Sequence, residues 1–169
     1  HTGNHKPLET ITQNGVENTV TSNATQGERQ YTLIDTFTNS TNGAESSYYA
    51  LAYLADVYNH QDLVNALANP NTVITLKNNI ELQSNVDINK EMTTIKGDGF
   101  TIYNRNHKLT VKHKNITIEN VKFEDYKDIA LSIWNSENVK LTSVDMNGNP
   151  KESTVRSAVG IEIYGSTVE

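Results

Sequence analysis

Residues 116–146 read ITIENVKFEDYKDIALSIWNSENVKLTSVDM, and the predicted fold class follows from them. Its apolar residues alternate with polar ones, as in half-buried β-strands, and the pattern recurs after 23 residues, which is the step that joins Ile95, Ile118 and Leu141. The same offset aligns Phe100 with Phe123 and Met146, and Val86 and Ile88 with Leu109 and Val111. A period this short cannot hold a pair of helices. We therefore predict an all-β solenoid, a right-handed parallel β-helix in which each repeat is one coil.

The composition bounds the class of protein. The chain has 169 residues, enough for one domain, and 36% of them are hydrophobic. Its net charge of -6 is too small to predict disorder throughout. Nucleic-acid-binding domains are usually basic, so the acidic balance argues against nucleic acid as a partner.

Several classes are excluded by what the sequence lacks. There is no cysteine, which rules out disulfides and thiolate metal sites, and we predict no cofactor and no metal. No window approaches the roughly 20 apolar residues of a membrane span, so we predict no membrane insertion of this chain. Because the chain starts with His1 and ends on a strand-like pattern, we expect upstream sequence and further coils in the native protein.

Three segments are predicted along the chain. Residues 1–45 form a polar, extended N-terminal segment, residues 46–71 a helical cap, and residues 72–169 the coils. Between Ala44 and Leu54 the apolar spacing is partly helical. From Asn59, a suitable N-cap, to Ala68 the helical pattern is clearer, and Pro70 ends it. A helix here would cover the open end of the first coil, which otherwise exposes its core and an unpaired strand edge.

The helical cap and the first coil also carry a family resemblance. Residues 62–71 read DLVNALANPN, and VITL at 73–76 and NIEL at 79–82 follow them. This phrase resembles the pectate-lyase-like adhesin domains of Gram-positive surface proteins, which occur in serine-rich repeat adhesins. The resemblance covers residues 55–169. It implies a right-handed parallel β-helix, secretion to the bacterial cell surface, and non-catalytic binding of host or plant polysaccharide.

Catalysis on this fold would need groups that the chain supplies only in part. A pectate lyase uses an acidic calcium cluster with a basic residue that abstracts a proton. The candidates by residue type are Asp125, Asp128, Asp145 and Arg156. The signature motifs of pectate lyases and polygalacturonases are absent, so we predict no catalytic residue, and a truncated polysaccharide lyase is the third hypothesis.

Two features favour ligand binding. The first is a basic run between Arg105 and Lys114 in an otherwise acidic chain, and the second is a pair of aromatic residues that the repeat places on neighbouring coils. In register, Lys112 lies beside Trp134, and Trp134 beside Tyr164, all facing outward. The predicted ligand-binding residues are Arg105, His107, Lys108, Lys112, His113, Lys114, Trp134 and Tyr164. The alternatives are an ordinary solvated charged coil, and a Trp134 ring that tucks under a neighbouring loop.

The first functional hypothesis is therefore an adhesin domain whose lateral face binds an acidic polysaccharide, such as a pectin-like uronic acid polymer, or a host glycan. His107 and His113 then predict stronger binding below about pH 6.5, where imidazoles gain charge. The second hypothesis is homotypic association that leads to cell aggregation or biofilm. It rests on two outward charge pairs of neighbouring coils, Lys96 with Glu119 and Lys122 with Asp145.

Overall fold

The structure is a computed structural model that describes residues 19–21, 28–38, 41–149 and 159–169. The chain divides into two compact units, His1–Leu54 and Ala55–Glu169. Each unit is considered by itself.

The first unit is built from antiparallel strands. Strand β1 (Thr19–Thr21) pairs with β2 (Glu28–Thr38), and β2 pairs with β3 (Glu45–Val57). The predicted helical character of residues 46–54 is therefore wrong, because this segment is a strand that finds a long partner in β2. Sheet pairing overrides a weak helical spacing, and tyrosine is itself favourable in strands. Within the predicted N-terminal segment 1–45, the strands β1 and β2 were not predicted, and residues 1–18, 22–27 and 39–40 lie outside the described part.

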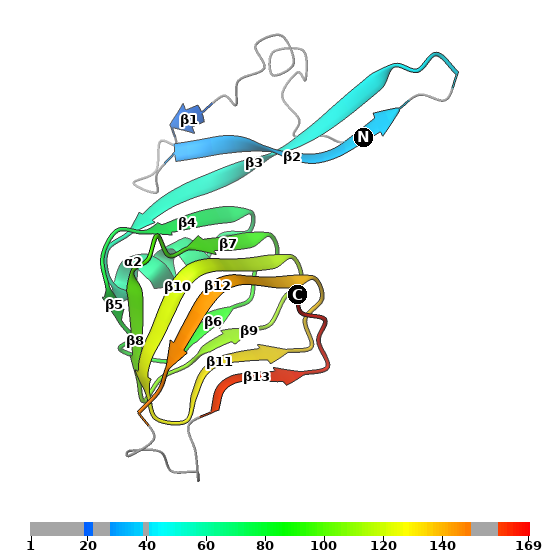
Figure 1. Ribbon diagram of the computed structural model, residues 1–169. Coiled ribbons are helices and arrows are strands. Elements are labelled where there is room, and N and C mark those ends of the chain that lie inside the picture. The colour runs from blue at the N-terminus through cyan, green and yellow to red at the C-terminus, as the bar shows by residue number, and fades with distance from the viewer. Residues whose placement is uncertain (1–18, 22–27, 39–40, 150–158) are drawn as a thin grey trace. The chain divides into compact units, whose positions relative to one another are not determined.

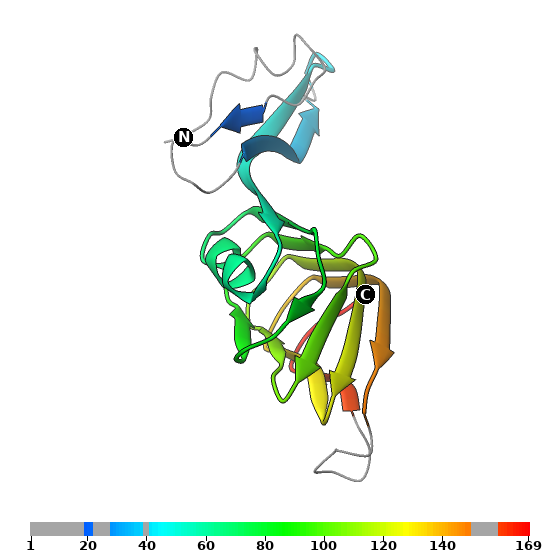
Figure 2. The same cartoon turned by 90° about the vertical axis from the view of Figure 1, so that its left-hand side faces the viewer.

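The second unit is a parallel β-helix of about four coils, as predicted (Figure 1). The strands of the first two coils are β4 (Thr72–Leu76), β5 (Ile80–Glu81), β6 (Val86–Ile88), β7 (Thr93–Lys96), β8 (Thr101–Arg105) and β9 (Leu109–Val111). The next two coils consist of β10 (Ile116–Tyr126), β11 (Ile129–Trp134), β12 (Val139–Asn147) and β13 (Val159–Tyr164). One lateral sheet has the order β13-β11-β9-β6. Figure 2 shows the coils stacked with their strands in parallel.

The register keeps the 23-residue step between β6 and β9 and along β7, β10 and β12, and it departs from that step in the other parallel pairs. Ile118 pairs with Ile95 on one side and with Leu141 on the other, as predicted. Phe123, however, pairs with Ile102 and not with Phe100. The turn at Gly97–Gly99 takes up two residues, because the backbone N–H groups of Gly97 and Gly99 both donate to carbonyls of the third coil. The alignment of Phe100 with Phe123 is therefore wrong.

The predicted capping helix is confirmed as α2 (His60–Leu67). The Asn59 side chain accepts a hydrogen bond from the backbone N–H of Asp62 at 2.9 Å, which satisfies an otherwise free donor of the first turn. Leu63 is fully buried in the same apolar core as Ile74 and Leu76 of the first coil. The helix thus seals the core at the first coil.

Corners between coils are made by residues in the left-handed backbone region. One corner stacks Asn71, Met92, Asn115 and Asn138, with φ of 50, 58, 59 and 53°. Asparagine tolerates this conformation better than most residues, which explains why three of the four corner residues are asparagine. The Asn138 amide also donates to the Asn115 side-chain oxygen at 2.7 Å, so the corner residues support one another.

Candidate functional site

The predicted aromatic pair lies on the outside of the sheet β13-β11-β9-β6. Trp134 ends β11 and Tyr164 ends β13, and their rings stack with centroids 4.3 Å apart and planes 20° from parallel. The two residues are 44% and 57% exposed, so Trp134 stacks in the open and does not tuck under a loop. The stack covers one face of each ring with the other ring, and the rest of both rings is open to solvent.

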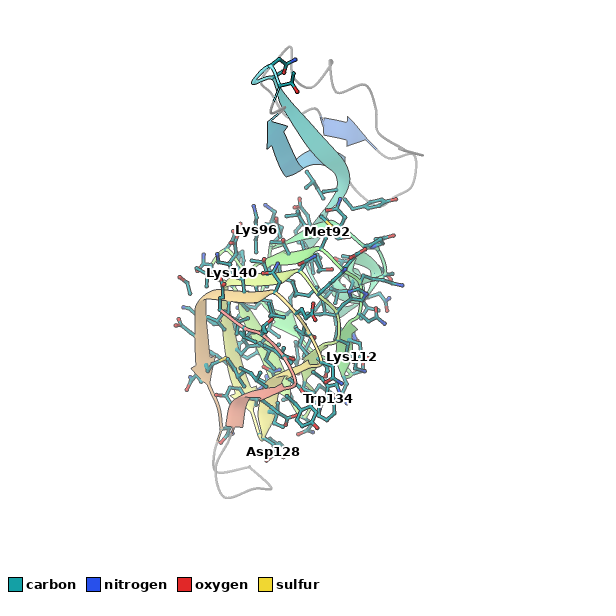
Figure 3. All side chains as sticks on the ribbon, turned by 90° about the vertical axis from the view of Figure 1, so that its right-hand side faces the viewer. Met92, Lys96, Lys112, Asp128, Trp134 and Lys140 are labelled. Atoms are coloured by element: carbon teal, nitrogen blue, oxygen red, sulfur yellow. The ribbon has the colours of Figure 1, made fainter. Side chains whose placement is uncertain are left out.

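Lys112 lies beside this aromatic pair (Figure 3). Val111 and Ile133 are in register, so Lys112 and Trp134, which follow them, are neighbours on adjacent strands. Its ammonium group is 2.7 Å from a carboxylate oxygen of Asp87 on β6. Both side chains are about half exposed, so the ion pair contributes little to stability. It does neutralise much of the positive charge that Lys112 would offer a ligand.

A polar column runs next to the aromatic column on the same sheet. Strand register aligns Asp87, Thr110, Ser132 and Glu162. The Ser132 hydroxyl donates to the Glu162 carboxylate at 3.2 Å, which fixes one acceptor beside Tyr164. Asp87 and Glu162 were not among the site residues predicted from the sequence, although their alternation with apolar neighbours already placed them outward.

A groove of about 280 Å³ lies between α2 and β6. Its apolar lining comes mainly from Val64 and Leu67 of the helix and Val86 of the strand, and its polar lining includes Asp87 and Asn89. Asp87 thus belongs both to the polar column and to the groove. The groove continues the outer face of the sheet at the β6 edge.

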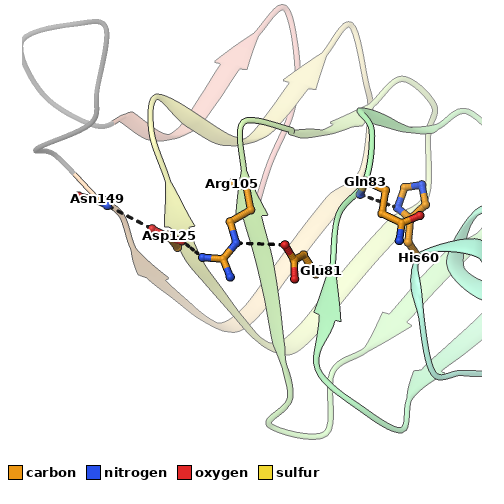
Figure 4. Close-up of polar contacts among 6 residues, drawn as sticks. All are labelled: His60, Glu81, Gln83, Arg105, Asp125 and Asn149. Atoms are coloured by element: carbon orange, nitrogen blue, oxygen red, sulfur yellow. Dashed lines mark hydrogen bonds and ion pairs between the residues drawn. The ribbon is translucent and has the colours of Figure 1, made fainter.

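Arg105 lies apart from the aromatic pair, at the end of β8 in the other sheet (Figure 4). It pairs with Glu81 at 3.4 Å and also with Asp125, whose other oxygen accepts from the Asn149 amide at 3.2 Å. The guanidinium carbon is 5.3 Å from the centre of the Tyr103 ring. Arg105 is thus one member of a row of polar side chains across four coils. Glu81 and Asp125 in this row neutralise its positive charge.

The remaining predicted basic residues are spread around the second coil. His107 is half-buried and its backbone N–H donates to the Asn104 carbonyl, while Lys108 donates its backbone N–H to the Asn85 side chain. His113 is half-buried and accepts the Lys114 backbone N–H at 2.9 Å. Lys114 faces Glu91 at 3.9 Å. The structure therefore brings Lys112, Trp134 and Tyr164 together but does not gather the basic run into a single patch.

His60, which the sequence analysis did not name, fastens α2 to the first coil (Figure 4). Its Nδ1 accepts the Gln83 backbone N–H at 3.3 Å, and its Nε2 lies 3.2 Å from the Ser84 hydroxyl. Burial, and then the neighbouring His107, lower the pKa of His60 below its usual 6.5. The ring is therefore held neutral, which suits its role as an acceptor.

The groups considered for catalysis do not assemble in the described part of the chain. Asp125 is engaged with Arg105 and Asn149, and Arg156 lies outside the described residues. Within the described ranges, no group of three or more histidine, aspartate or glutamate side chains could hold a metal ion. No helix among these residues is long and apolar enough to cross a membrane.

Comparisons of the chain with protein-family models, with curated proteins and with solved structures gave no match. Fold and site together define a parallel β-helix protein with an exposed aromatic pair on one lateral sheet. The resemblance to pectate-lyase-like adhesin domains stays a prediction.

Proposed function

We propose that the chain is a non-catalytic adhesin domain of a Gram-positive bacterial cell surface that binds polysaccharide or host glycan through the sheet β13-β11-β9-β6. The observation that supports this most is the open stack of Trp134 on Tyr164. Aromatic faces contact the apolar faces of sugar rings, while neighbouring charged groups form hydrogen bonds with the sugar hydroxyls. The resemblance of the helical cap and first coil to surface adhesins supports secretion to the cell surface.

The ligand predicted from sequence is an acidic polysaccharide or a host glycan. Lys112 beside the aromatic pair favours an anion, whereas its pairing with Asp87 reduces that preference. The histidine hypothesis needs His107 and His113 to gain charge near the ligand, and both are half-buried. Acidic and neutral ligands must therefore be compared directly.

The test is a polysaccharide array read with wild type, Trp134→Ala and Tyr58→Ala. Tyr58 is 54% exposed but lies away from the aromatic pair, next to the N-terminus of α2, so it controls for loss of any exposed aromatic. An aromatic contact contributes about 1 kcal/mol, so we expect Trp134→Ala to weaken binding roughly fivefold to tenfold and Tyr58→Ala to leave it unchanged. Equal losses in both variants, or binding that neither variant alters, would contradict the proposed face. Repeating the array at about pH 5 and about pH 7.5 tests the histidine hypothesis.

Homotypic association is the second candidate function. The register places Lys96 beside Glu119 and Lys122 beside Asp145, as the sequence predicted, so β10 has a cation beside an anion on each side of its corner at Asn120. Such a surface can meet a second copy with opposite charges in contact. Concentration-dependent dimers in analytical ultracentrifugation that disappear in Lys122→Glu would favour this function over glycan binding.

A polysaccharide lyase remains the third candidate. Its test is the ultraviolet absorbance of unsaturated product released from polygalacturonate in the presence of calcium. A steady rise with wild-type protein would overturn the non-catalytic proposal.

A further inference from the structure

The charged side chains around the aromatic pair do not favour the binding of an anion. Asp87 and Glu162 carry two carboxylates on this face, and Lys112 supplies one ammonium group that already contacts Asp87 at 2.7 Å. An anionic ligand would have to approach two carboxylates and compete with Asp87 for Lys112. Carboxylates are instead strong acceptors for neutral sugar hydroxyls, with which they form charge-assisted hydrogen bonds.

The same residues define a direction across the coils. Tyr164, Trp134 and Lys112 stand at equivalent positions of β13, β11 and β9, and Asn89 follows the next strand, β6. Neighbouring strands are about 4.8 Å apart, so this row extends over about 14 Å, a length that suits an oligosaccharide and not a single sugar. Asn89 and Asp87 lead directly into the groove against α2, where Val64 offers apolar surface.

We infer that the glycan bound on this face is an uncharged chain, which crosses the strands from Tyr164 to Lys112 and ends in the groove between β6 and α2. This inference rests on the proposed function and specifies its ligand. The aromatic pair stacks on the sugar rings at one end. Asp87 and Glu162 accept hydroxyl hydrogens along the chain, and the groove holds the terminal sugar.

The charge of the ligand is tested with matched polymers. Neutral galactan and fully methyl-esterified polygalacturonate are compared with de-esterified polygalacturonate, which differs from the ester in charge. We expect at least tenfold stronger binding of a neutral polymer than of the free acid, and little effect of added salt, since screening weakens only interactions between charges. Binding of the free acid that equals or exceeds neutral binding would overturn the uncharged class and leave the proposed function standing.

The variant Asp87→Asn is a second test of the preference for an uncharged ligand. The substitution keeps the shape of the side chain but frees the Lys112 ammonium from its partner. We expect roughly fivefold stronger binding of de-esterified polygalacturonate and weaker binding of the neutral polymer. Unchanged binding of both polymers would contradict the role of Asp87.

The path into the groove is tested by chain length. Wild-type affinity should rise from disaccharide to hexasaccharide of the neutral polymer and then level off. Val64 is 38% exposed, and Val64→Trp should fill the groove and abolish the gain from the longer oligosaccharides without changing disaccharide binding. Gln61→Trp, on an exposed position of α2 outside the groove lining, is the control and should bind as wild type.

The outcomes distinguish failure of the inferred glycan path from failure of the proposed glycan-binding function. If Val64→Trp retains the full gain with length, the path into the groove is wrong, while loss of binding in Trp134→Ala still supports the glycan face. If folded wild-type protein binds neither the neutral nor the acidic polymers, both the inference and the proposed function are contradicted.

Discussion

His60 connects the capping helix to the first coil through a hydrogen bond that depends on its protonation. Nδ1 accepts the Gln83 backbone N–H, and a protonated ring cannot accept there. The pKa of His60 is lowered in the folded protein by burial and by His107, so between this lowered value and 6.5 the unfolded chain binds more protons. Stability therefore rises with pH through this window and is lost as the pH falls below about 6.5. We expect the melting temperature to be constant above about pH 7 and to fall towards pH 5.

The variant His60→Gln tests the source of this dependence. It should lower the free energy of unfolding by about 1 kcal/mol at neutral pH, because the hydrogen bond to Gln83 is weakened, and it should flatten the decline at acid pH. The control is His113→Gln, which replaces a histidine that accepts the backbone N–H of the adjacent Lys114. A His60→Gln protein whose melting temperature falls as steeply as that of wild type would contradict the assignment.

Gly97 lies at a close approach of the second and third coils. A Cβ atom at this position would be 2.2 Å from the Asn120 carbonyl oxygen and 2.5 Å from a Val121 methyl carbon. Gly97→Ala should therefore destabilise the protein by about 2–3 kcal/mol, as overpacking does in cores. Gly99→Ala has open space around the new methyl group but a φ of +82°, so it should cost only about 1 kcal/mol. Urea unfolding of both variants gives the comparison, and equal losses would contradict the close approach at Gly97.

At the scale of elements, the corner that stacks Asn71, Met92, Asn115 and Asn138 contains one poorly suited residue. Met92 has φ of 58° and no side-chain amide to support the left-handed conformation. Met92→Asn should raise the free energy of unfolding by about 0.5–1 kcal/mol by removing that strain. Asn115→Ala should lower it by about 1 kcal/mol, since the bond from Asn138 is lost as well. Denaturant midpoints measure both, and a less stable Met92→Asn protein would show that its half-buried side chain outweighs the strain.

Element prediction from the sequence succeeded where one period repeats. The alternation around Ile95, Ile118 and Leu141 set the register of the coils because a shift by one residue would turn every apolar side chain outward. It failed at Phe100, where the length of a turn and not the apolar pattern fixes the pairing. It failed again at β3, because antiparallel pairing with the neighbouring strand β2, and not the spacing of its apolar residues, makes this segment a strand.

The sequence also predicted only part of the candidate site. Outward-facing neighbours on adjacent coils follow from register alone, so the stack of Trp134 on Tyr164 could be predicted. The partners of the basic run could not, because Glu81, Asp87 and Glu91 reach their cations from the preceding coil through side-chain conformations that no spacing specifies. The groove could not be predicted either, since it exists only where α2 packs beside β6.

For the whole molecule, the division of the chain at Leu54 predicts an independent folding unit. The described apolar core begins at Val57, whose carbonyl also accepts the Lys77 backbone N–H at 2.9 Å, and it is closed by α2. In a solenoid each coil is stabilised mainly by its neighbours, so the first coil depends on its cap.

A fragment of residues 55–169 should therefore unfold cooperatively, with a melting temperature within a few degrees of the corresponding transition in the full chain. A fragment of residues 72–169 lacks α2 and should expose the Ile74 side of the core and a free strand edge, so we expect it to aggregate. Circular dichroism melts and size-exclusion chromatography of the two fragments decide between these outcomes. An unfolded 55–169 fragment would mean that the β-helix requires the first unit, and a soluble, cooperative 72–169 fragment would mean that α2 does not act as the cap.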